Sequence, residues 1–200
     1  MKLNESFYKR SNVLTVSQAL LGKLIFSNIE GQVTAGMIVE TEAYSWQNDR
    51  ACHAYMGKRT KRNEIMYASG GVAYVYLCYG LHYMLNIVTN DINKADAVLI
   101  RAIEPKVGKE TMRKRRCLQK LDFKATSGPG KLCQALGIDL SQNGESLIEN
   151  TIWLESSEIR ISKSQIKTSK RIGIDYAGPD ALKKWRFFIR DNPYVSRPPL

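Results

Sequence analysis

The sequence predicts an α+β fold in a single domain that spans residues 1–200. Two pairs of strand-like segments, each joined by a short turn, predict a mostly antiparallel sheet, and helix-forming segments stand before and after them. The chain has 200 residues, of which 44% are hydrophobic. That is enough for one substantial core and rather few for two. We find no internal repeat and no low-complexity segment.

The first part of the chain predicts a short helix followed by a hairpin. Ser17 can cap a helix over 16–21, and a glycine suited to the left-handed conformation follows that helix. Segments 24–29 and 33–44 then read as strands joined by a Glu-Gly turn, because apolar and polar residues alternate through Met37, Val39, Thr41 and Ala43. We therefore expect two antiparallel strands here.

The second strand of this hairpin presents polar side chains on one face. Because side chains alternate along a strand, Glu40, Glu42 and Tyr44 share a surface. Taken alone, Glu42 could equally form a salt bridge with a nearby arginine. The opposite face holds Val39, Thr41 and Ala43.

The middle of the chain predicts a long loop and a second hairpin. Residues 45–71 are polar and irregular and contain a basic run, which indicates a functional loop rather than a linker. Segments 72–79 and 83–89 are rich in aromatic and β-branched residues, and Gly80 permits a tight reversal between them.

The rest of the chain adds two helices and three strands. Residues 97–103 predict a buried strand, and 106–120 predict a helix with a basic cluster. Ser127, which comes shortly before a proline, resembles the cap of a helix that runs through Leu136. The remaining strands are expected at 151–155 and 185–190.

The charge of the chain points to a polyanionic partner. Thirty Lys and Arg stand against 19 Asp and Glu, a net charge of +11 that favours binding to phosphates. Clusters at 58–62, 113–116 and 167–171 would singly be solvated faces, but their joint excess indicates that at least one follows a nucleic-acid backbone. We expect a cytosolic protein without a membrane partner, because no segment approaches the roughly 20 apolar residues of a membrane span.

Cysteines and histidines give no sign of a metal or cofactor site. Only two histidines are present, and the four cysteines form no C-x-x-C pair. In a reducing cytosol most of these cysteines are expected to pack as small apolar side chains. A lone histidine is more often a structural hydrogen-bonding residue than a catalyst. The cysteines are Cys52, Cys78, Cys117 and Cys133, and the histidines are His53 and His82.

The segment Gly128-Pro129-Gly130-Lys131 resembles part of a phosphate-binding loop. The full pattern needs a glycine at position 125 and Ser or Thr at position 132, where this chain has Ala125 and Leu132. A nucleotide-triphosphate site is therefore not expected. Lys131 and the free N–H groups of the helix start could hold a DNA phosphate, and a simple helix cap is an equal alternative.

A stripe of tyrosines follows the second hairpin. Tyr74 and Tyr76 share one strand face, and Tyr79 lies on the other face beside the turn. Such a stripe usually belongs to the core. Next to a basic loop it could instead stack on an extruded base, and an aromatic at the hairpin tip could wedge into the gap that the base leaves. Periodicity alone leaves both readings open.

Together these segments resemble the alkyladenine DNA glycosylase family, also called the mammalian type of 3-methyladenine DNA glycosylase. The resemblance covers most of the chain and depends on many motifs in the same order. They are Val39-Glu40-Thr41-Glu42-Ala43-Tyr44, Ala51-Cys52-His53, Thr60-Lys61-Arg62-Asn63, Tyr74-Val75-Tyr76-Leu77-Cys78-Tyr79-Gly80, Asn86-Ile87, residues 98–105, residues 127–136 and Arg171-Ile172-Gly173-Ile174.

The resemblance implies a set of catalytic residues. Glu42 matches the general base that activates a water molecule, Arg101 helps to hold this water, and the backbone carbonyl of Ile172 matches a third water ligand. A purine alkylated at N3 or N7 is cationic and leaves readily, so positioned water and a carboxylate supply the main requirements. No lysine matches a Schiff-base nucleophile of the family, so strand cleavage is not expected.

The resemblance also implies a pocket for the damaged base. Tyr44 and Tyr76 match the aromatic walls that sandwich the flipped base, and His53 matches a residue at its edge. Asn86 matches the residue that crowds the 2-amino group of guanine. Aromatic walls favour cationic, electron-deficient rings through the negative charge of the ring face.

For DNA contacts the resemblance points to the second hairpin. Tyr79 matches the side chain that intercalates into the vacated stack, and Leu81 and His82 stand beside it as departures from the family pattern. Segment 89–96 is also slightly longer than in mammalian relatives, so the minor-groove fit is expected to differ. With Lys131, these residues are the expected DNA contacts.

These matches imply a monofunctional glycosylase with a curved sheet, flanking helices and a protruding DNA-inserting hairpin. The implied partner is double-stranded DNA that contains alkylated or deaminated purines, the class of 3-methyladenine, 7-methylguanine, hypoxanthine and ethenoadenine. The chain is expected to work as a monomer without cofactor or metal, in a bacterial cytoplasm in association with the nucleoid. A non-catalytic nucleic-acid-binding protein and, less favoured, a metal nuclease are the alternatives.

Overall fold

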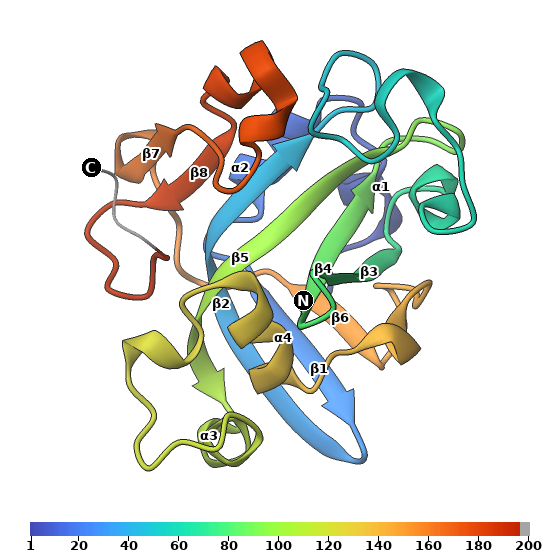
Figure 1. Ribbon diagram of the computed structural model, residues 1–200. Helices are drawn as coiled ribbons and strands as arrows, with labels where there is room; N and C mark the ends of the chain where they lie inside the picture. Colours follow the sequence, from blue (N-terminus) through green and yellow to red (C-terminus); the bar gives the residue numbers. More distant parts are fainter. Residues whose placement is uncertain (197–200) are drawn as a thin grey trace.

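The centre of the fold is a twisted sheet (Figure 1). The computed structural model describes residues 1–196. Within these residues the sheet has eight strands, with the main order β3-β4-β5-β2-β1-β6, and β8 joins β7 to β2. All neighbouring strands are antiparallel, which confirms the α+β class with a mostly antiparallel sheet. The strands are β1 (Leu24–Ile29), β2 (Gln32–Tyr44), β3 (Ala73–Cys78), β4 (His82–Thr89), β5 (Asp96–Val107), β6 (Ile152–Glu155), β7 (Ile166–Ser169) and β8 (Arg186–Ile189).

The two longest strands, β2 and β5, pair along most of their length and carry the site residues. Their register shifts between Ile38 and Glu40 and again between Glu40 and Thr41. Glu40 pairs with Ala102 and Thr41 pairs with Ile100. Arg101, which lies between these two partners, therefore has no directly paired residue on β2. Bulges of this kind re-aim side chains, and here they occur where Glu40 and Arg101 meet.

Four short α-helices pack around the sheet: α1 (Glu5–Tyr8), α2 (Val13–Ala19), α3 (Lys109–Arg115) and α4 (Pro129–Leu136). Helix α2 packs on β2 and β5, and α4 packs on β4 and β5. The described residues also contain six 3-10 helices: η1 (Tyr55–Gly57), η2 (Glu64–Tyr67), η3 (Phe123–Ala125), η4 (Leu140–Gln142), η5 (Lys163–Gln165) and η6 (Asp175–Leu182). In residues 1–196, no helix combines the length and the apolar character needed to cross a bilayer.

Two expected helix caps were wrong. Helix α2 begins earlier than expected, because the Asn12 side chain accepts from the N–H groups of Leu14 and Thr15, at 3.0 and 3.1 Å. Ser17 is instead buried inside the helix, and its hydroxyl donates to Thr41 Oγ1 on β2 at 2.9 Å. At α4 the cap position falls on a glycine, while the Ser127 hydroxyl contacts the carbonyl of a C-terminal residue.

The helix expected over 106–120 was too long. Strand β5 continues through Val107, and Gly108 then adopts a left-handed conformation with φ of +67° before α3 starts. A Cβ at Gly108 would lie 2.5 Å from the Val33 carbonyl oxygen, so the chain can turn there only without a side chain. The helix ends after Arg115, and Cys117 follows with φ of +50°.

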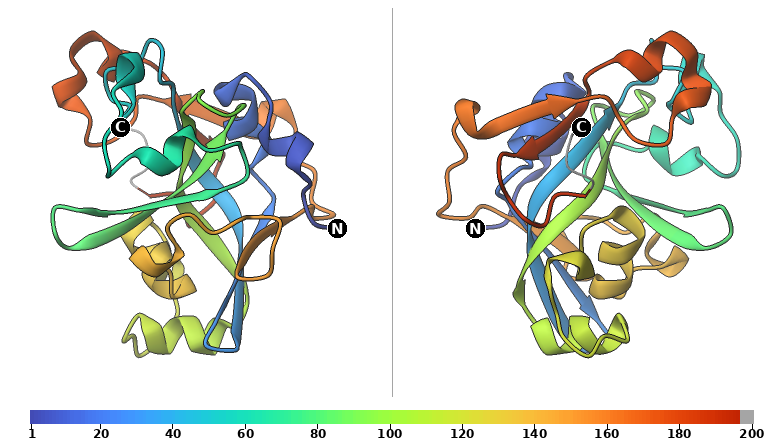
Figure 2. Two further views of the ribbon diagram at one scale, coloured as in Figure 1. Left: turned by 90° about the vertical axis from the view of Figure 1, so that its right-hand side faces the viewer. Right: turned by 60° about the vertical axis from the view of Figure 1, so that its left-hand side comes forward.

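The second hairpin, β3–β4, projects away from the body of the molecule, and both views of Figure 2 show it standing clear. Its base is buried, since Leu85 and Ile87 belong to the main core. Its tip is exposed, with Tyr79 and Leu81 retaining 87% and 75% of their accessible surface. The expectation of a protruding hairpin is therefore confirmed as a matter of fold.

Candidate active site

A small pocket opens where the end of β2 meets the β3–β4 hairpin and the long loop. The loop, residues 45–71, and segment η6 lie side by side at the top of Figure 1, joined by a hydrogen bond from the Arg50 N–H to Asp180 at 3.0 Å. The cavity is narrow, with a volume of about 40 Å³. The walls are Tyr44, Ala51, His53, Met66, Tyr74, Tyr76, Asn86 and Tyr176.

Glu42 is fully buried behind this pocket, and two hydrogen-bond donors and one ion pair hold its carboxylate. The Tyr44 hydroxyl donates to Oε2 at 2.8 Å, and the Ile172 N–H donates to Oε1 at 2.8 Å. Arg101 Nη1 lies 3.3 Å from Oε2. Because strand β2 places Glu42 and Tyr44 two residues apart, their shared face follows directly from the strand period.

The groups around Glu42 keep their own protonation states. Burial raises the pKa of Tyr44 well above its ordinary value, and the neighbouring Glu42 carboxylate adds to this, so the phenol remains a donor. Burial opposes the charge on Arg101, but Glu42 and Glu40 raise its pKa, so the guanidinium stays a cation. Glu42 thus lies between a neutral donor and a positive one.

Arg171 supports the pocket from behind. It lies in a cluster expected on the basic surface, yet it is 5% exposed and donates to both oxygens of Asp49, at 2.5 and 2.7 Å. Its guanidinium also donates to the Ala43 carbonyl and lies 4.7 Å from the centre of the Tyr44 ring. Arg171 therefore fixes the end of β2, and the reading of this residue as part of a surface cluster was wrong.

His53 enters the pocket wall from the long loop. Its Nδ1 is 2.9 Å from the Tyr74 hydroxyl, and its ring lies against Tyr76 with centroids 4.8 Å apart. Burial lowers the pKa of His53 to about 4, assisted by the positive charges of Arg62 and Lys58. The imidazole is therefore neutral near pH 7 and can both donate and accept a hydrogen bond.

Asn86 and the tyrosines complete the wall from the hairpin. Asn86 on β4 pairs with Tyr74 on β3 and donates from its side-chain amide to the Tyr74 carbonyl at 3.2 Å. Tyr74 is 1% exposed and packs with Tyr76 at a centroid distance of 5.4 Å. Tyr74 and Tyr76 of the stripe thus both line the pocket. Tyr74 also packs in a core cluster, and the Arg62 guanidinium lies over Tyr76.

The hairpin tip holds the residues expected to contact DNA. Tyr79 adopts a left-handed conformation with φ of +50°, which turns the chain just before Gly80. His82 is exposed and lies against α4, where a Cβ at Gly130 would come within 2.8 Å of the His82 Cβ. The glycine before Lys131 is therefore required by close packing on the hairpin. Lys131 itself is exposed in the first turn of α4.

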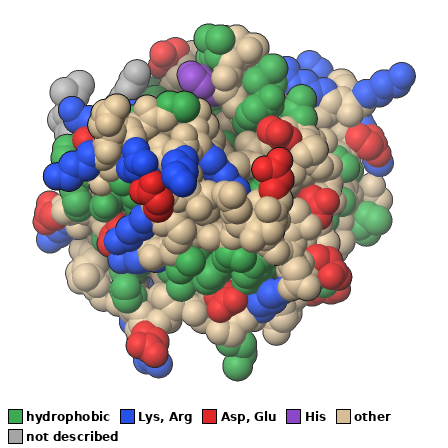
Figure 3. Space-filling view, turned by 90° about the horizontal axis from the view of Figure 1, so that it is seen from below, with side chains coloured by type: hydrophobic (Ala, Val, Ile, Leu, Met, Phe, Trp, Pro, Cys, Tyr) green, Lys and Arg blue, Asp and Glu red, His purple; other side chains and the backbone are tan. Residues whose placement is uncertain are grey.

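Some cations of the basic clusters form surface ion pairs with carboxylates. Arg59 pairs with Glu64 at 2.5 Å, and Arg113 pairs with Glu110 at 2.7 Å. Figure 3 shows Lys and Arg side chains gathered on one side of the face seen from below. The exposed cations of the three clusters include Lys58, Lys61, Arg62, Lys114, Lys167 and Lys170.

Several residues near the site were not expected. Tyr176 in η6 is 69% exposed, yet it lines the mouth of the pocket and lies 3.5 Å from the Ala51 carbonyl. Glu40, Arg186 and Ser196 form a buried polar cluster next to Arg101. Of these residues, only Glu40 could have been placed near the site from the sequence, because it shares the strand face of Glu42. Within residues 1–196, no group of three His, Cys, Asp or Glu side chains is arranged to hold a metal ion.

Comparison with known proteins gives consistent matches over nearly the whole chain. A family model described as methylpurine-DNA glycosylase matches residues 6–193. A protein of Natranaerobius thermophilus named "Putative 3-methyladenine DNA glycosylase" is 46% identical over 197 residues, 98% of this chain and 99% of the relative. Proteins of the same name from Clostridium perfringens and Chlamydia pneumoniae are 44% and 47% identical over 207 and 188 residues. These alignments cover 98% and 94% of this chain, and 100% and 94% of the relatives.

Proposed function

The chain belongs to the methylpurine-DNA glycosylase family, and from this premise we propose that it flips alkylated or deaminated purines out of duplex DNA and removes them. Family membership makes it a hydrolase that acts on N-glycosyl bonds of DNA, which answers the alternative of a non-catalytic binding protein. The proposed bases are 3-methyladenine, 7-methylguanine, hypoxanthine and ethenoadenine. Their removal starts base excision repair.

The observation that carries the proposal is a buried carboxylate, Glu42, which two hydrogen bonds and an ion pair hold behind an aromatic pocket. We assign Glu42 as the general base that takes a proton from water as the water attacks the sugar. The same carboxylate stabilises positive charge that develops on the sugar as the glycosidic bond breaks. Arg101 and the Ile172 carbonyl are the proposed partners of this water.

The pocket walls are proposed to select the base. Tyr44 and Tyr76 would stack on its two faces, and an electron-poor ring gains most from such stacking. Neutral His53 can hydrogen-bond its edge, because the pKa of His53 lies near 4. Asn86 is anchored to the Tyr74 backbone, which supports its proposed role of crowding a 2-amino group. A neutral base additionally needs a proton as it leaves.

The exposed hairpin is the proposed contact with duplex DNA. Tyr79 would fill the gap left by the flipped base, with Leu81 and His82 beside it in the minor groove and Lys131 on a phosphate. All four side chains are exposed on the projecting hairpin or on α4 beside it. We further propose that the chain acts as a monomer, one domain over residues 1–200, on the nucleoid in the bacterial cytoplasm.

The test uses duplexes that each carry one defined lesion. The expected result is release of the free base with both strands intact, and continued release when a chelator is present. Glu42→Gln should bind the lesion duplex but release no base, because the amide keeps the shape and cannot accept the proton. Strand cleavage without base release, or an active Glu42→Gln enzyme, would contradict the proposal.

A further inference from the structure

Glu40 is a second buried carboxylate on the strand that carries Glu42. Its side chain is fully buried, does not line the base pocket, and accepts from three residues. Arg101 Nε donates to Oε1 at 2.9 Å, and Arg186 Nε donates to the same oxygen at 2.7 Å. Ser196 donates from its N–H to Oε2 at 2.6 Å and from its hydroxyl to Oε1 at 2.9 Å. Such complete pairing is needed for a charge in the interior.

The Arg101 guanidinium joins Glu40 to Glu42. Its Nε binds Glu40, and its Nη1 faces Glu42 Oε2 at 3.3 Å. Because a guanidinium is planar and rigid, a hydrogen bond at Nε sets the direction of the remaining nitrogens. The position of the Arg101 edge that faces Glu42 therefore depends on Glu40.

Arg186 balances the charge of this cluster. Two carboxylates, Glu40 and Glu42, lie next to one guanidinium, that of Arg101, which leaves one negative charge to be compensated. Arg186 supplies the second positive charge on the side of Glu40, and its side chain is 3% exposed. Each carboxylate thus has a guanidinium within 3.3 Å, and Arg101 is not drawn wholly toward Glu40.

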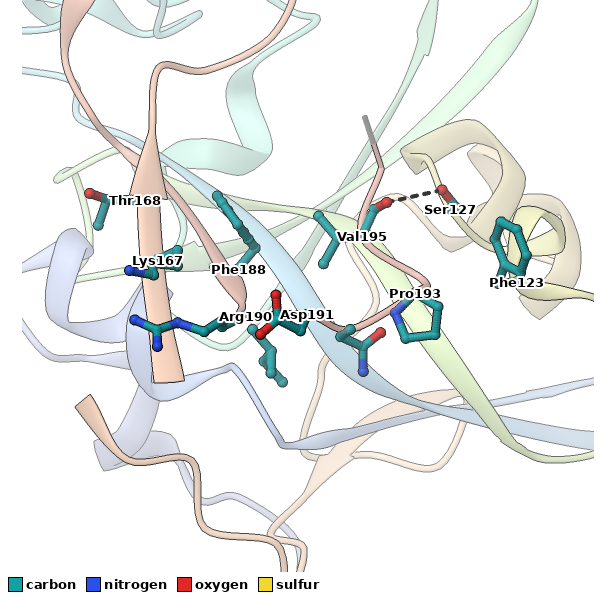
Figure 4. Close-up of a pocket in the computed structure, with 11 residues that line it drawn as sticks. Phe123, Ser127, Lys167, Thr168, Phe188, Arg190, Asp191, Pro193 and Val195 are labelled. Atoms are coloured by element: carbon teal, nitrogen blue, oxygen red, sulfur yellow. Dashed lines mark hydrogen bonds between the residues drawn. The ribbon is translucent and has the colours of Figure 1, made fainter. Parts of the chain in front are cut away.

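The C-terminal segment supplies the third partner of Glu40. Figure 4 shows Ser127, at the start of α4, reaching across to the Val195 carbonyl, which it contacts at 3.5 Å. The Asn192 side chain also donates to Glu104 on β5 at 3.2 Å and accepts from the Tyr194 N–H at 2.9 Å. These contacts fix the segment that brings Ser196 to Glu40, and Ser196 also lies 3.4 Å from Arg101 Nη2.

We propose that Glu40, completed by Arg186 and Ser196, is a positioning residue that orients Arg101 toward Glu42 and the attacking water. This inference rests on the proposed function of Glu42 and Arg101. It extends the site to the last part of the chain, more than 150 residues from Glu42, and gives the C-terminal segment a role in the chemical step.

The test compares Glu40→Gln and Ser196→Ala with a matched control in single-turnover excision. Glu40→Gln keeps the shape but removes the charge, and it should slow excision on the order of 10- to 100-fold, as small displacements of catalytic groups do. Ser196→Ala should slow excision less, about threefold to tenfold, because only one of the contacts that hold Glu40 is lost. Lesion-DNA binding should stay nearly unchanged in both. Ser27→Ala is the control, because Ser27 is a buried hydrogen-bonded serine on β1 away from the pocket, and it should excise at the wild-type rate.

A double-mutant cycle separates positioning from stability. If Glu40 acts through Arg101, Glu40→Gln should slow excision much less in an Arg101→Lys background than in the wild type. Equal slowing in both backgrounds would overturn the inference, and so would wild-type rates in folded Glu40→Gln and Ser196→Ala. If Glu40→Gln fails to fold, Ser196→Ala with its Ser27→Ala control decides. A wild type that releases no base would instead overturn the proposed function and this inference together.

Discussion

Replacing Tyr79 with alanine separates the wedge role of the hairpin from a packing role. Tyr79 is 87% exposed, and a fully buried tyrosine covers roughly 150–250 Å². The remaining 13% of its surface corresponds to roughly 25 Å², or about 0.6 kcal/mol of unfolding free energy at 25 cal/mol per Å². For a chain of this size the thermal midpoint should fall by only about 1–2 °C.

Tyr74 provides the matched control on the same hairpin. It is 1% exposed, so truncation to alanine leaves a cavity and should cost about 3–5 kcal/mol. The corresponding fall in the thermal midpoint is roughly 6–20 °C. The structure therefore predicts opposite behaviour for two tyrosines five residues apart.

The effect of Tyr79→Ala on excision should depend on the partner base. Extruding a paired base costs a few kcal/mol, and a wedge offsets part of this cost only while the base is out of the stack. If the wedge contributes about 1.4 kcal/mol, single-turnover excision from a paired lesion should fall about tenfold. A lesion opposite a mismatch is already easier to extrude, so its excision should fall less. A large loss of thermal stability, together with equal defects in both contexts, would show that Tyr79 is a packing residue.

Four further predictions follow from the site. Glu42→Gln should abolish base release while lesion-duplex affinity stays within about threefold, and excision near the wild-type rate in single turnover would refute the general-base role. Asn86→Ser should raise guanine excision relative to hypoxanthine excision, whereas a parallel loss on both bases would mark Asn86 as a folding residue. Log affinity for undamaged duplex should fall with log salt by roughly 0.9 per phosphate neutralised, and affinity unchanged between low and moderate salt would argue against a phosphate-binding surface. The pKa of His53 is depressed to about 4 in the folded state, so unfolded chains take up the proton first as pH falls. About 3 kcal/mol of stability should therefore be lost between pH 6.5 and pH 4 and retained in His53→Asn, as measured by urea unfolding.

Local sequence patterns determined most of the strands and part of the site. The turn at Gly80 and the aromatic and β-branched residues on both sides of it predicted the second hairpin, because turn and strand preferences act over a few residues. That this hairpin projects was implied by the family resemblance. The strand period of two placed Glu42 and Tyr44 on one face, where the Tyr44 hydroxyl does reach the carboxylate. The family resemblance supplied His53, Tyr76 and Asn86, and the structure brings them together with Tyr44 around one pocket.

Local patterns were less successful where a tertiary hydrogen bond competes with a local one. Ser17 and Ser127 are both chemically able to cap a helix. In the structure the Ser17 hydroxyl instead donates to Thr41 and the Ser127 hydroxyl to the Val195 carbonyl. The cap of α2 is Asn12. The helix expected over 106–120 lost its first residues to β5, since pairing with β2 outweighs a weak helix propensity.

Only the tertiary structure decided which partners Arg171 and Glu40 have. Arg171 belongs to the same basic cluster as its exposed neighbour Lys170, yet it is buried because Asp49 and the Ala43 carbonyl pair with it. Ser196 binds Glu40 across 156 residues of chain. Periodicity and capping rules describe neighbours along the chain, whereas these contacts depend on strand order, on register shifts in β2 and β5, and on burial that forces each charge to find a partner.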